Sequence, residues 1–85
     1  MIIHNLTELC QWVEQRAADV LADYDPRLAA YAVEDIASVI HRNAHGQQLS
    51  WGDDWGWVFE MYGTEQMKAI AIESAKIHGK RLRIQ

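Results

Sequence analysis

The sequence has little cysteine, little proline and no long apolar run, and each shortage excludes a class of protein. A single cysteine, Cys10, excludes an internal disulfide framework and favours a reducing, cytoplasmic environment. One proline and a hydrophobic content of 49% argue against a disordered chain. No apolar run approaches the roughly 18 residues of a membrane-spanning helix, and no signal-like segment opens the chain. We therefore expect one cytoplasmic domain over residues 1–85.

The motifs that carry enzyme chemistry are also missing. Neither of the glycine-rich phosphate loops, GxGxxG and GxxxxGK[ST], occurs in the chain. Cys10 falls on the apolar face of a predicted helix, where a thiol is usually unreactive. Asp53 and Asp54 are adjacent, so on a helix their carboxylates would diverge instead of pairing for acid–base work. We expect no enzymatic activity and no cofactor.

Charge is divided unevenly along the chain. Residues 1–66 hold three basic and eleven acidic residues, a net charge of −8, whereas residues 67–85 hold five basic and one acidic, a net charge of +4. The acidic body disfavours nucleic-acid binding, because phosphate contacts need clustered lysine and arginine. The basic tail either complements the dipole of the last helix or forms a small positive patch. Its basic residues are Lys76, Lys80, Arg81 and Arg83.

Hydrophobic periodicity predicts two long helices in the first half of the chain. Apolar residues recur at helical spacing over residues 6–23, with Asn5 as the N-cap and Glu8 as its capping-box partner. A second helix is predicted over residues 26–45, with Pro26 at its first position, where the missing N–H costs nothing. Strong amphipathicity at both segments indicates an all-α protein.

The second half predicts a helix over residues 64–78, capped by Thr64 and ended by Gly79. With a further helix over residues 52–62, the fold class is a small single-domain bundle of three to four helices. The short apolar ends, "MIIH" and "RLRIQ", are compatible with a minimal two-stranded β-ribbon between the termini.

Residues 49–63, "LSWGDDWGWVFEMYG", hold three of the four tryptophans. If residues 52–62 are helical, most of these aromatic residues fall on one stripe about 100° wide and are predicted to be core. The members of the stripe are Trp51, Trp55, Val58, Phe59 and Tyr62. Gly52 and Gly56 leave an irregular loop open as the alternative, because each glycine costs a helix up to ~1 kcal/mol.

Trp57 projects from the opposite side of that predicted helix. An exposed tryptophan is typical of a binding hot spot, and an acidic rim attracts basic partners. The alternative places Trp57 beneath the loop or against the tail, stacked on Arg81 or Arg83. The candidate partner-binding residues are Trp57, Asp53, Asp54, Glu60, Met61 and Trp12.

These features favour a protein-interaction module that binds, and inhibits or modulates, a larger partner protein with a basic surface. Size and charge alone are those of immunity-type proteins and of phage-encoded modulators of host machinery, an analogy that points to a bacterial or phage protein. A homodimer through the Trp57 side is a further interpretation. The alternative from another class is a nucleic-acid-binding accessory protein that uses the basic tail with Arg42, His41 and His45.

A metal site has only a short pattern to support it. His41 and His45 stand four residues apart, the spacing at which two imidazoles on one helix face share a metal ion. The third ligand would have to come from His78, His4 or Asp53. Because no cysteine pair accompanies them, and histidine is common near helix C-termini, we expect no bound metal.

Overall fold

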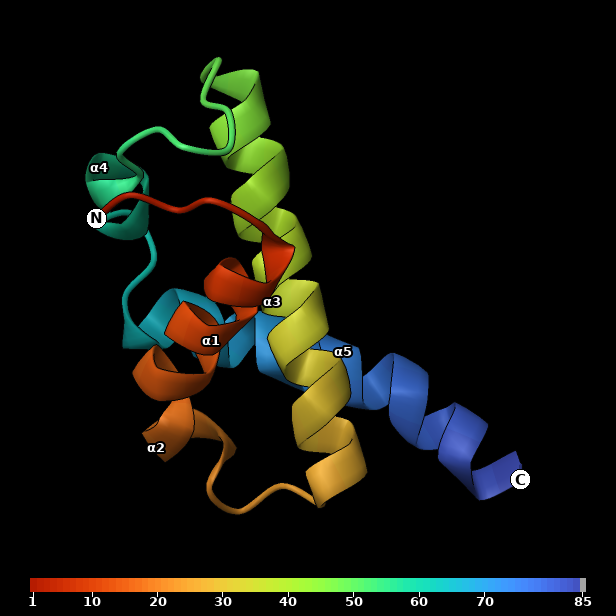
Figure 1. The fold of residues 1–85 in the computed structure, drawn as a ribbon. Helices are drawn as coiled ribbons and strands as arrows, with labels where there is room; N and C mark the ends of the chain where they lie inside the picture. Colours follow the sequence, from red (N-terminus) through yellow and green to blue (C-terminus); the bar gives the residue numbers. More distant parts are fainter. Residues whose placement is uncertain (85) are drawn as a thin grey trace.

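The computed structural model describes residues 1–84, with side chains described through Lys80 (Figure 1). Helices dominate this part of the chain, and no strand occurs in it beyond one isolated bridge, so the all-α class is confirmed. Residues 1–84 form five helices instead of the expected three to four. They are α1 (Leu6–Arg16), α2 (Ala18–Leu21), α3 (Pro26–Gly46), α4 (Gly56–Phe59) and α5 (Thr64–Ile84).

Two long helices, α3 and α5, cross and make the most extensive contact in the fold (Figure 1). Helix α1 packs on α3, α2 packs on α5, and α4 contacts α3. The N-terminal segment runs beside α4, and the C-terminal half of α5 extends past α3, which gives the molecule its dimensions of 40 × 22 × 18 Å. No helix in the described part of the chain is both long and apolar enough to cross a bilayer.

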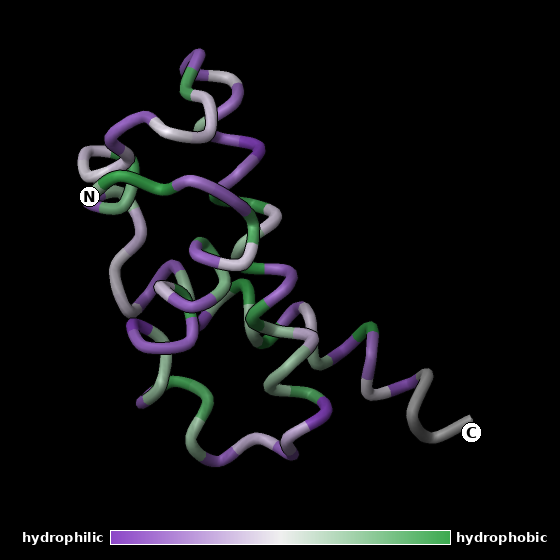
Figure 2. The backbone as a smooth tube through the Cα atoms, in the orientation of Figure 1, coloured by the Kyte–Doolittle hydropathy of each residue, from purple (hydrophilic) through white to green (hydrophobic). Residues whose placement is uncertain are grey.

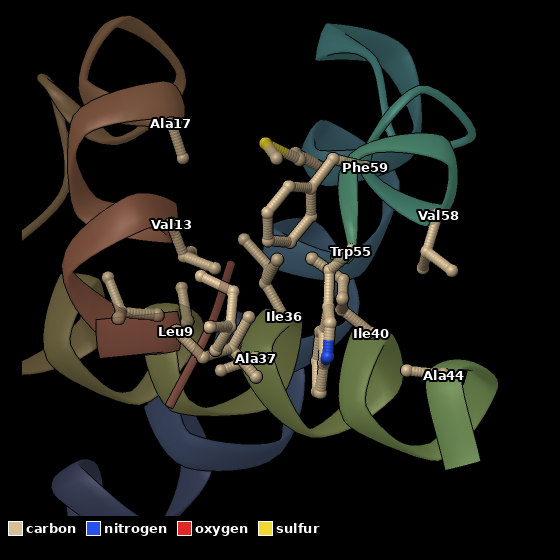
Figure 3. Close-up of a cluster of buried hydrophobic side chains, with 14 of the residues drawn as sticks. Leu9, Val13, Ala17, Ile36, Ala37, Ile40, Ala44, Trp55, Val58 and Phe59 are labelled. Atoms are coloured by element: carbon tan, nitrogen blue, oxygen red, sulfur yellow. The ribbon is translucent and has the colours of Figure 1, made fainter. Parts of the chain in front are cut away.

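The core lies where α1, α3 and the segment around α4 meet (Figure 3). Hydropathy alternates along α3, as an amphipathic helix requires (Figure 2). Among the described side chains, α5 buries fewer than α3. The buried apolar residues are Ile3, Leu9, Val13, Ala17, Leu21, Ala32, Val33, Ile36, Ala37, Ile40, Ala44, Trp55, Val58, Phe59, Met67 and Ala71.

Side-chain caps begin both long N-terminal helices at the expected residues. The Asn5 side chain accepts a hydrogen bond from the Glu8 N–H at 2.9 Å, and the Asp25 side chain accepts one from the Arg27 N–H at 2.8 Å. The predicted capping box is shifted by one residue. The Glu8 carboxylate accepts the backbone N–H of His4, at 2.9 Å, and also contacts the His4 ring nitrogen, at 3.0 Å.

The single helix predicted over residues 6–23 is wrong, because the chain bends at Ala17 between α1 and α2. Backbone hydrogen bonds continue through the bend: the Ala17 N–H donates to Val13, and the Ala17 carbonyl accepts from Leu21. Ala17 itself is fully buried. The bend thus keeps both Val13 and Leu21 in the core while α2 reaches α5. The helix predicted over 26–45 differs from α3 by one residue.

The predictions for the C-terminal end are wrong in two respects. Gly79 does not end the last helix, because α5 continues to Ile84; a glycine inside a helix costs roughly 1 kcal/mol, which does not stop it. Nor do the termini form a ribbon, because residues 81–84 belong to α5. Instead, Ile2 forms an isolated antiparallel bridge with Asp54.

Helix α5 starts without the expected Thr64 side-chain cap. Thr64 is already its first helical residue, and the Gly63 N–H donates instead to the Gln66 side chain at 3.0 Å. This is the glutamine half of a capping box, and it satisfies a donor that the helix leaves free.

Candidate functional site

The predicted helix over residues 52–62 is wrong: only Gly56–Phe59 is helical. Gly52 has a φ of 95°, a left-handed conformation that glycine adopts without strain. The following aspartates compete with a helix for backbone donors. Asp53 accepts the Ser50 N–H at 2.7 Å, and Asp54 accepts the Gly56 N–H at 2.9 Å.

The N-terminal segment holds this irregular loop in place. The Gly52 N–H donates to the Ile3 carbonyl at 2.6 Å, and the Ile3 N–H donates to the Asp53 carbonyl at 3.2 Å. The Trp55 N–H donates to the Met1 carbonyl at 2.8 Å. Loop donors that a helix would satisfy internally are therefore satisfied by a distant part of the sequence.

The residues of segment 51–62 that face the core are in part those of the predicted stripe (Figure 3). Trp55, only 1% exposed, is buried with Val58 and Phe59, and its indole N–H donates to the Ser50 carbonyl at 3.1 Å. The prediction of a core position for Trp51 is wrong, because its side chain is 40% exposed. Trp51 precedes the left-handed Gly52, so helical spacing no longer relates it to the later residues.

Trp51 instead takes part in a surface stack. Its ring lies 4.8 Å from that of His41 and 5.1 Å from that of Trp55, nearly parallel to both. Tyr62, the last member of the predicted stripe, is half-buried, and its hydroxyl accepts a hydrogen bond from the Asn43 amide at 2.9 Å. Stacking and hydrogen bonding therefore tie both ends of the aromatic segment to α3.

Trp57 lies on the solvent side of α4, and its side chain is 47% exposed. Met61, which follows α4, is 49% exposed. Such exposure contradicts burial of Trp57 beneath the loop. The alternative of a stack on Arg81 or Arg83 lies outside the described side chains. Sequence periodicity found the outward direction of Trp57 because α4, although only one turn long, spans residues 56–59.

The carboxylates around Trp57 are not equivalent. Asp53 is held by the Ser50 N–H, and Asp54 forms a 2.6 Å ion pair with the Met1 ammonium. That ammonium, followed by the Gly56 N–H, holds the pKa of Asp54 below its usual range. Glu60 is exposed and has no ion pair with any described residue. Of the predicted acidic rim, Glu60 is thus the carboxylate with no partner inside the described fold.

Trp12 lies on α1 and joins the surface indirectly. Its half-buried ring stacks on Phe59 at a centroid distance of 3.8 Å and an interplanar angle of 9°. Its edge and Met1 line the same shallow hollows. The Met1 nitrogen in turn lies 3.5 Å from the position that a Cβ on Gly56 would occupy. Met1 therefore connects Trp12 on α1 to the start of α4.

Two apolar residues at this surface were missed by sequence analysis. Met1 and Ile2 are both more than half exposed, yet they lie against the loop that precedes α4. Their pairing with residues 52–55 has no local sequence signal, because it joins segments about fifty residues apart. We call the exposed side chains Met1, Ile2, Trp57 and Met61 the Trp57 face.

No metal centre is assembled in the part of the chain that the structure describes, where no three ligand side chains come together. His41 is stacked on Trp51, and His45 is exposed one turn further along α3. His78 lies elsewhere, on α5, with its Nε2 3.2 Å from a carboxylate oxygen of Asp35 and its ring stacked on Tyr31. Of the three suggested third ligands, His78 is therefore engaged elsewhere on the fold, His4 contacts the Glu8 carboxylate, and Asp53 accepts the Ser50 N–H.

The basic residues of the nucleic-acid alternative lie at opposite ends of α3. Lys76 and Lys80 line a hollow with Arg27, near the start of α3, whereas Arg42 belongs to its last turns. Fifteen residues of helix separate Arg27 from Arg42, roughly 22 Å at 1.5 Å per residue. Lys76 is also within 3.7 Å of Glu73. The described basic side chains are thus divided between the two ends of α3.

Cys10 is a half-buried thiol on α1. Burial raises its pKa, and the nearby carboxylates of Glu34 and Glu14 raise it further. Both effects disfavour the thiolate, which is the nucleophilic and metal-binding form.

Comparison of the chain with known protein families, with curated proteins and with solved structures finds no match. The geometry of the exposed surfaces therefore carries the functional argument by itself.

Proposed function

We propose that this protein is a non-enzymatic binding module whose Trp57 face engages a larger protein with a basic surface. The observation that carries the proposal is the exposure of Trp57 in a turn whose other side is fully anchored. Tryptophan is the residue most enriched in binding hot spots, where a large ring fills a pocket of the partner.

The support under Trp57 is closely packed. Trp55, Val58 and Phe59 bury the inner side of the same turn, and the ring of Trp12 stacks on Phe59. The preceding loop is fixed by backbone bonds to the N-terminal segment. A side chain that is already positioned loses little conformational freedom on binding, which favours affinity.

The surroundings of Trp57 define the chemistry of the partner. Met61 follows Trp57 by four residues, and Met1 and Ile2 lie against the loop before α4; all three are exposed apolar side chains. Methionine adapts its shape to an irregular pocket. Glu60 and the net charge of −8 over residues 1–66 attract a basic rim around that pocket. Binding of this kind would cover a functional surface of the partner and thereby inhibit or modulate it.

The test compares wild-type protein with Trp57→Ala as bait in a lysate of the source organism, with retained proteins quantified by mass spectrometry. Ile72→Ala is the matched control, because Ile72 is also an exposed apolar residue but lies on α5. Any partner is then purified and its affinity measured. We expect Trp57→Ala to weaken binding by about 30-fold, the equivalent of ~2 kcal/mol for a hot-spot residue.

Two further measurements make the outcome decisive. Circular dichroism should show both variants folded, because an exposed side chain away from special features changes stability by only about 0.5 kcal/mol. Added salt should slow association, since the acidic rim acts mainly on the encounter rate. A partner retained equally by wild type and Trp57→Ala would refute the Trp57 face as the binding surface, and the absence of any enriched protein would refute the binding function.

A further inference from the structure

The C-terminal half of α5 is a second surface without a packing partner on its described outer side. Its inner side contacts α3 through His78, which stacks on Tyr31 at 4.0 Å. Ile77 is 50% exposed, and the exposed Lys76 and Lys80 border the open hollow beside Asp25 and Arg27 at the start of α3. We call residues 75–84 the α5 arm; at 1.5 Å per residue it is about 15 Å long. Figure 1 shows it projecting beyond α3.

A shallow groove lies on the body, between α1–α2 and the first half of α3. Its lining is almost entirely apolar, and its alanines leave room for another helix to approach closely. Glu14 lines the groove at one side. The apolar lining residues are Ala18, Leu21, Pro26, Ala29, Ala30 and Val33. We call this hollow the α1–α3 groove.

The groove has an acidic rim with no cation to match it among the described side chains. Glu34 lies one turn beyond Ala30 on α3, and Glu14 faces it from α1. Both carboxylates are close enough to Cys10 to raise the pKa of its thiol. Both are exposed, and neither forms an ion pair within residues 1–80. Two like charges on one groove repel each other, so a cation bound near both would lower that repulsion.

We propose that the α5 arm of one copy docks in the α1–α3 groove of a second copy, with Ile77 over the apolar floor and Lys80 between Glu14 and Glu34. Charge complementarity within one sequence selects this occupant. Residues 1–66 carry −8 and residues 67–85 carry +4, so the basic arm of each copy matches the acidic body of the other.

The arm cannot fill the groove of its own chain. Helix α5 is continuous to Ile84, and on its own side the arm borders a different hollow, lined by Asp25, Arg27 and Leu28 at the start of α3. A rigid helix would have to break to turn back. Exchange of arms between two copies places the same contact at both ends of a two-fold dimer, the commonest closed assembly of identical chains.

A charge-reversal experiment tests the dimer. The first variant is Lys80→Glu, which leaves the groove intact, and the second is Glu14→Lys with Glu34→Lys, which leaves the arm intact. Each is measured alone by size-exclusion chromatography with light scattering over a concentration series at low salt. We expect each variant to dissociate about tenfold more readily than wild type, because attraction becomes repulsion twice per dimer.

Mixing the two variants is the decisive step. In the mixed dimer, the unchanged arm of the groove variant enters the unchanged acidic groove, and the arm that carries Lys80→Glu enters the reversed, basic groove. Both contacts regain complementary charge, so association should return toward the wild-type level. Recovery on mixing also proves that both variants are folded. Arg42→Glu makes the same charge change at the far end of α3 and should leave the dimer unaffected.

Several results would overturn the proposal: a wild-type protein that stays monomeric at low salt and high concentration, variants that dimerise unchanged, or a mixture that does not recover. A monomer that binds duplex DNA through Lys80 would overturn it as well and favour the nucleic-acid alternative. Trp57→Ala should still dimerise, because neither the α5 arm nor the α1–α3 groove contains a residue of the Trp57 face. The dimer and the partner-binding function can therefore fail independently.

Discussion

The segment around α4 and the crossing of α3 with α5 are built by different means. At the crossing, two helices of 21 residues each bury small side chains such as Ala32, Ala71 and Ser74. Around α4, only four residues are helical, and buried aromatic rings with side-chain-to-backbone hydrogen bonds hold the chain. The crossing depends on periodicity within each helix, whereas the segment depends on contacts with the N-terminal residues.

This difference explains where an exposed functional side chain can be displayed. At the crossing, each helix presents one continuous face to its neighbour, so the outward residues are those of an ordinary amphipathic helix. Around α4, Trp55 is buried and Trp57, two residues later, is exposed. A single anchored turn thus presents one tryptophan outward while its neighbours fix it from beneath.

Removing the anchor should have the largest effect on the segment. We expect Trp55→Ala to lower the free energy of unfolding by about 3–5 kcal/mol, because it empties a large buried volume and removes the indole bond to Ser50. Urea unfolding followed by circular dichroism measures the loss. Trp51→Ala is the control: because Trp51 is partly exposed, the loss should be clearly smaller. Equal losses would show that the surface stack, not Trp55, anchors the segment.

Backbone conformation provides the next test, with opposite signs in the two regions. Gly52→Ala places a side chain at positive φ and should destabilise the protein by about 1–2 kcal/mol. Gly79→Ala, inside α5, should stabilise it by up to ~1 kcal/mol. Neither new Cβ meets a described atom within 4 Å, so the change in stability comes from backbone conformation and not from a steric clash. Thermal unfolding of both variants measures the signs; a destabilising Gly79→Ala would contradict a regular helix at that residue.

At the crossing itself, Ser74→Ala should stabilise the protein. The Ser74 hydroxyl is buried and has no hydrogen-bond partner among the described residues, as is also true of His78 Nδ1 one turn later. Removing an unsatisfied buried group and improving helix propensity should together add about 1 kcal/mol. Urea unfolding measures the gain, with the exposed Ser38→Ala on α3 as the control. A loss of stability would show that the Ser74 hydroxyl makes a bond in solution.

The smallest expected effect is a pH dependence at the exposed carboxylates. The His4 N–H, followed by the His4 ring, lowers the pKa of Glu8, just as the Met1 ammonium lowers that of Asp54. A carboxyl with a lowered folded-state pKa stabilises the protein above its ordinary value, 4.5 for Glu8 and 3.8 for Asp54. That stability disappears as the pH falls through the lowered pKa.

Thermal unfolding from pH 7 to pH 2 measures this dependence. Asp54→Asn should lower the midpoint at pH 7 and have no effect near pH 2, and Glu8→Gln should behave alike at the start of α1. Glu60→Gln serves as the control, because Glu60 has no ion pair among the described residues. A deficit of Asp54→Asn that persists at pH 2 would show that its contribution is not electrostatic.

The predicted stripe around α4 illustrates how far local spacing reaches. Trp55, Val58 and Phe59 are buried and Trp57 is exposed, as helical spacing predicted, because these four residues lie in or directly beside α4. Trp51 was misplaced because Gly52 reverses the backbone before that turn begins. Spacing arguments thus hold over one anchored turn and fail across a left-handed glycine.

The sequence by itself determined the all-α class and the beginnings of α1 and α3, because apolar periodicity and caps act over a few residues. Tertiary structure decided the rest of the candidate site. The N-terminal residues pair with the loop before α4, about fifty positions away, and this pairing fixes which side of the aromatic segment faces water. Local sequence patterns do not predict such a pairing, because its free energy comes from groups that meet only when the helices pack.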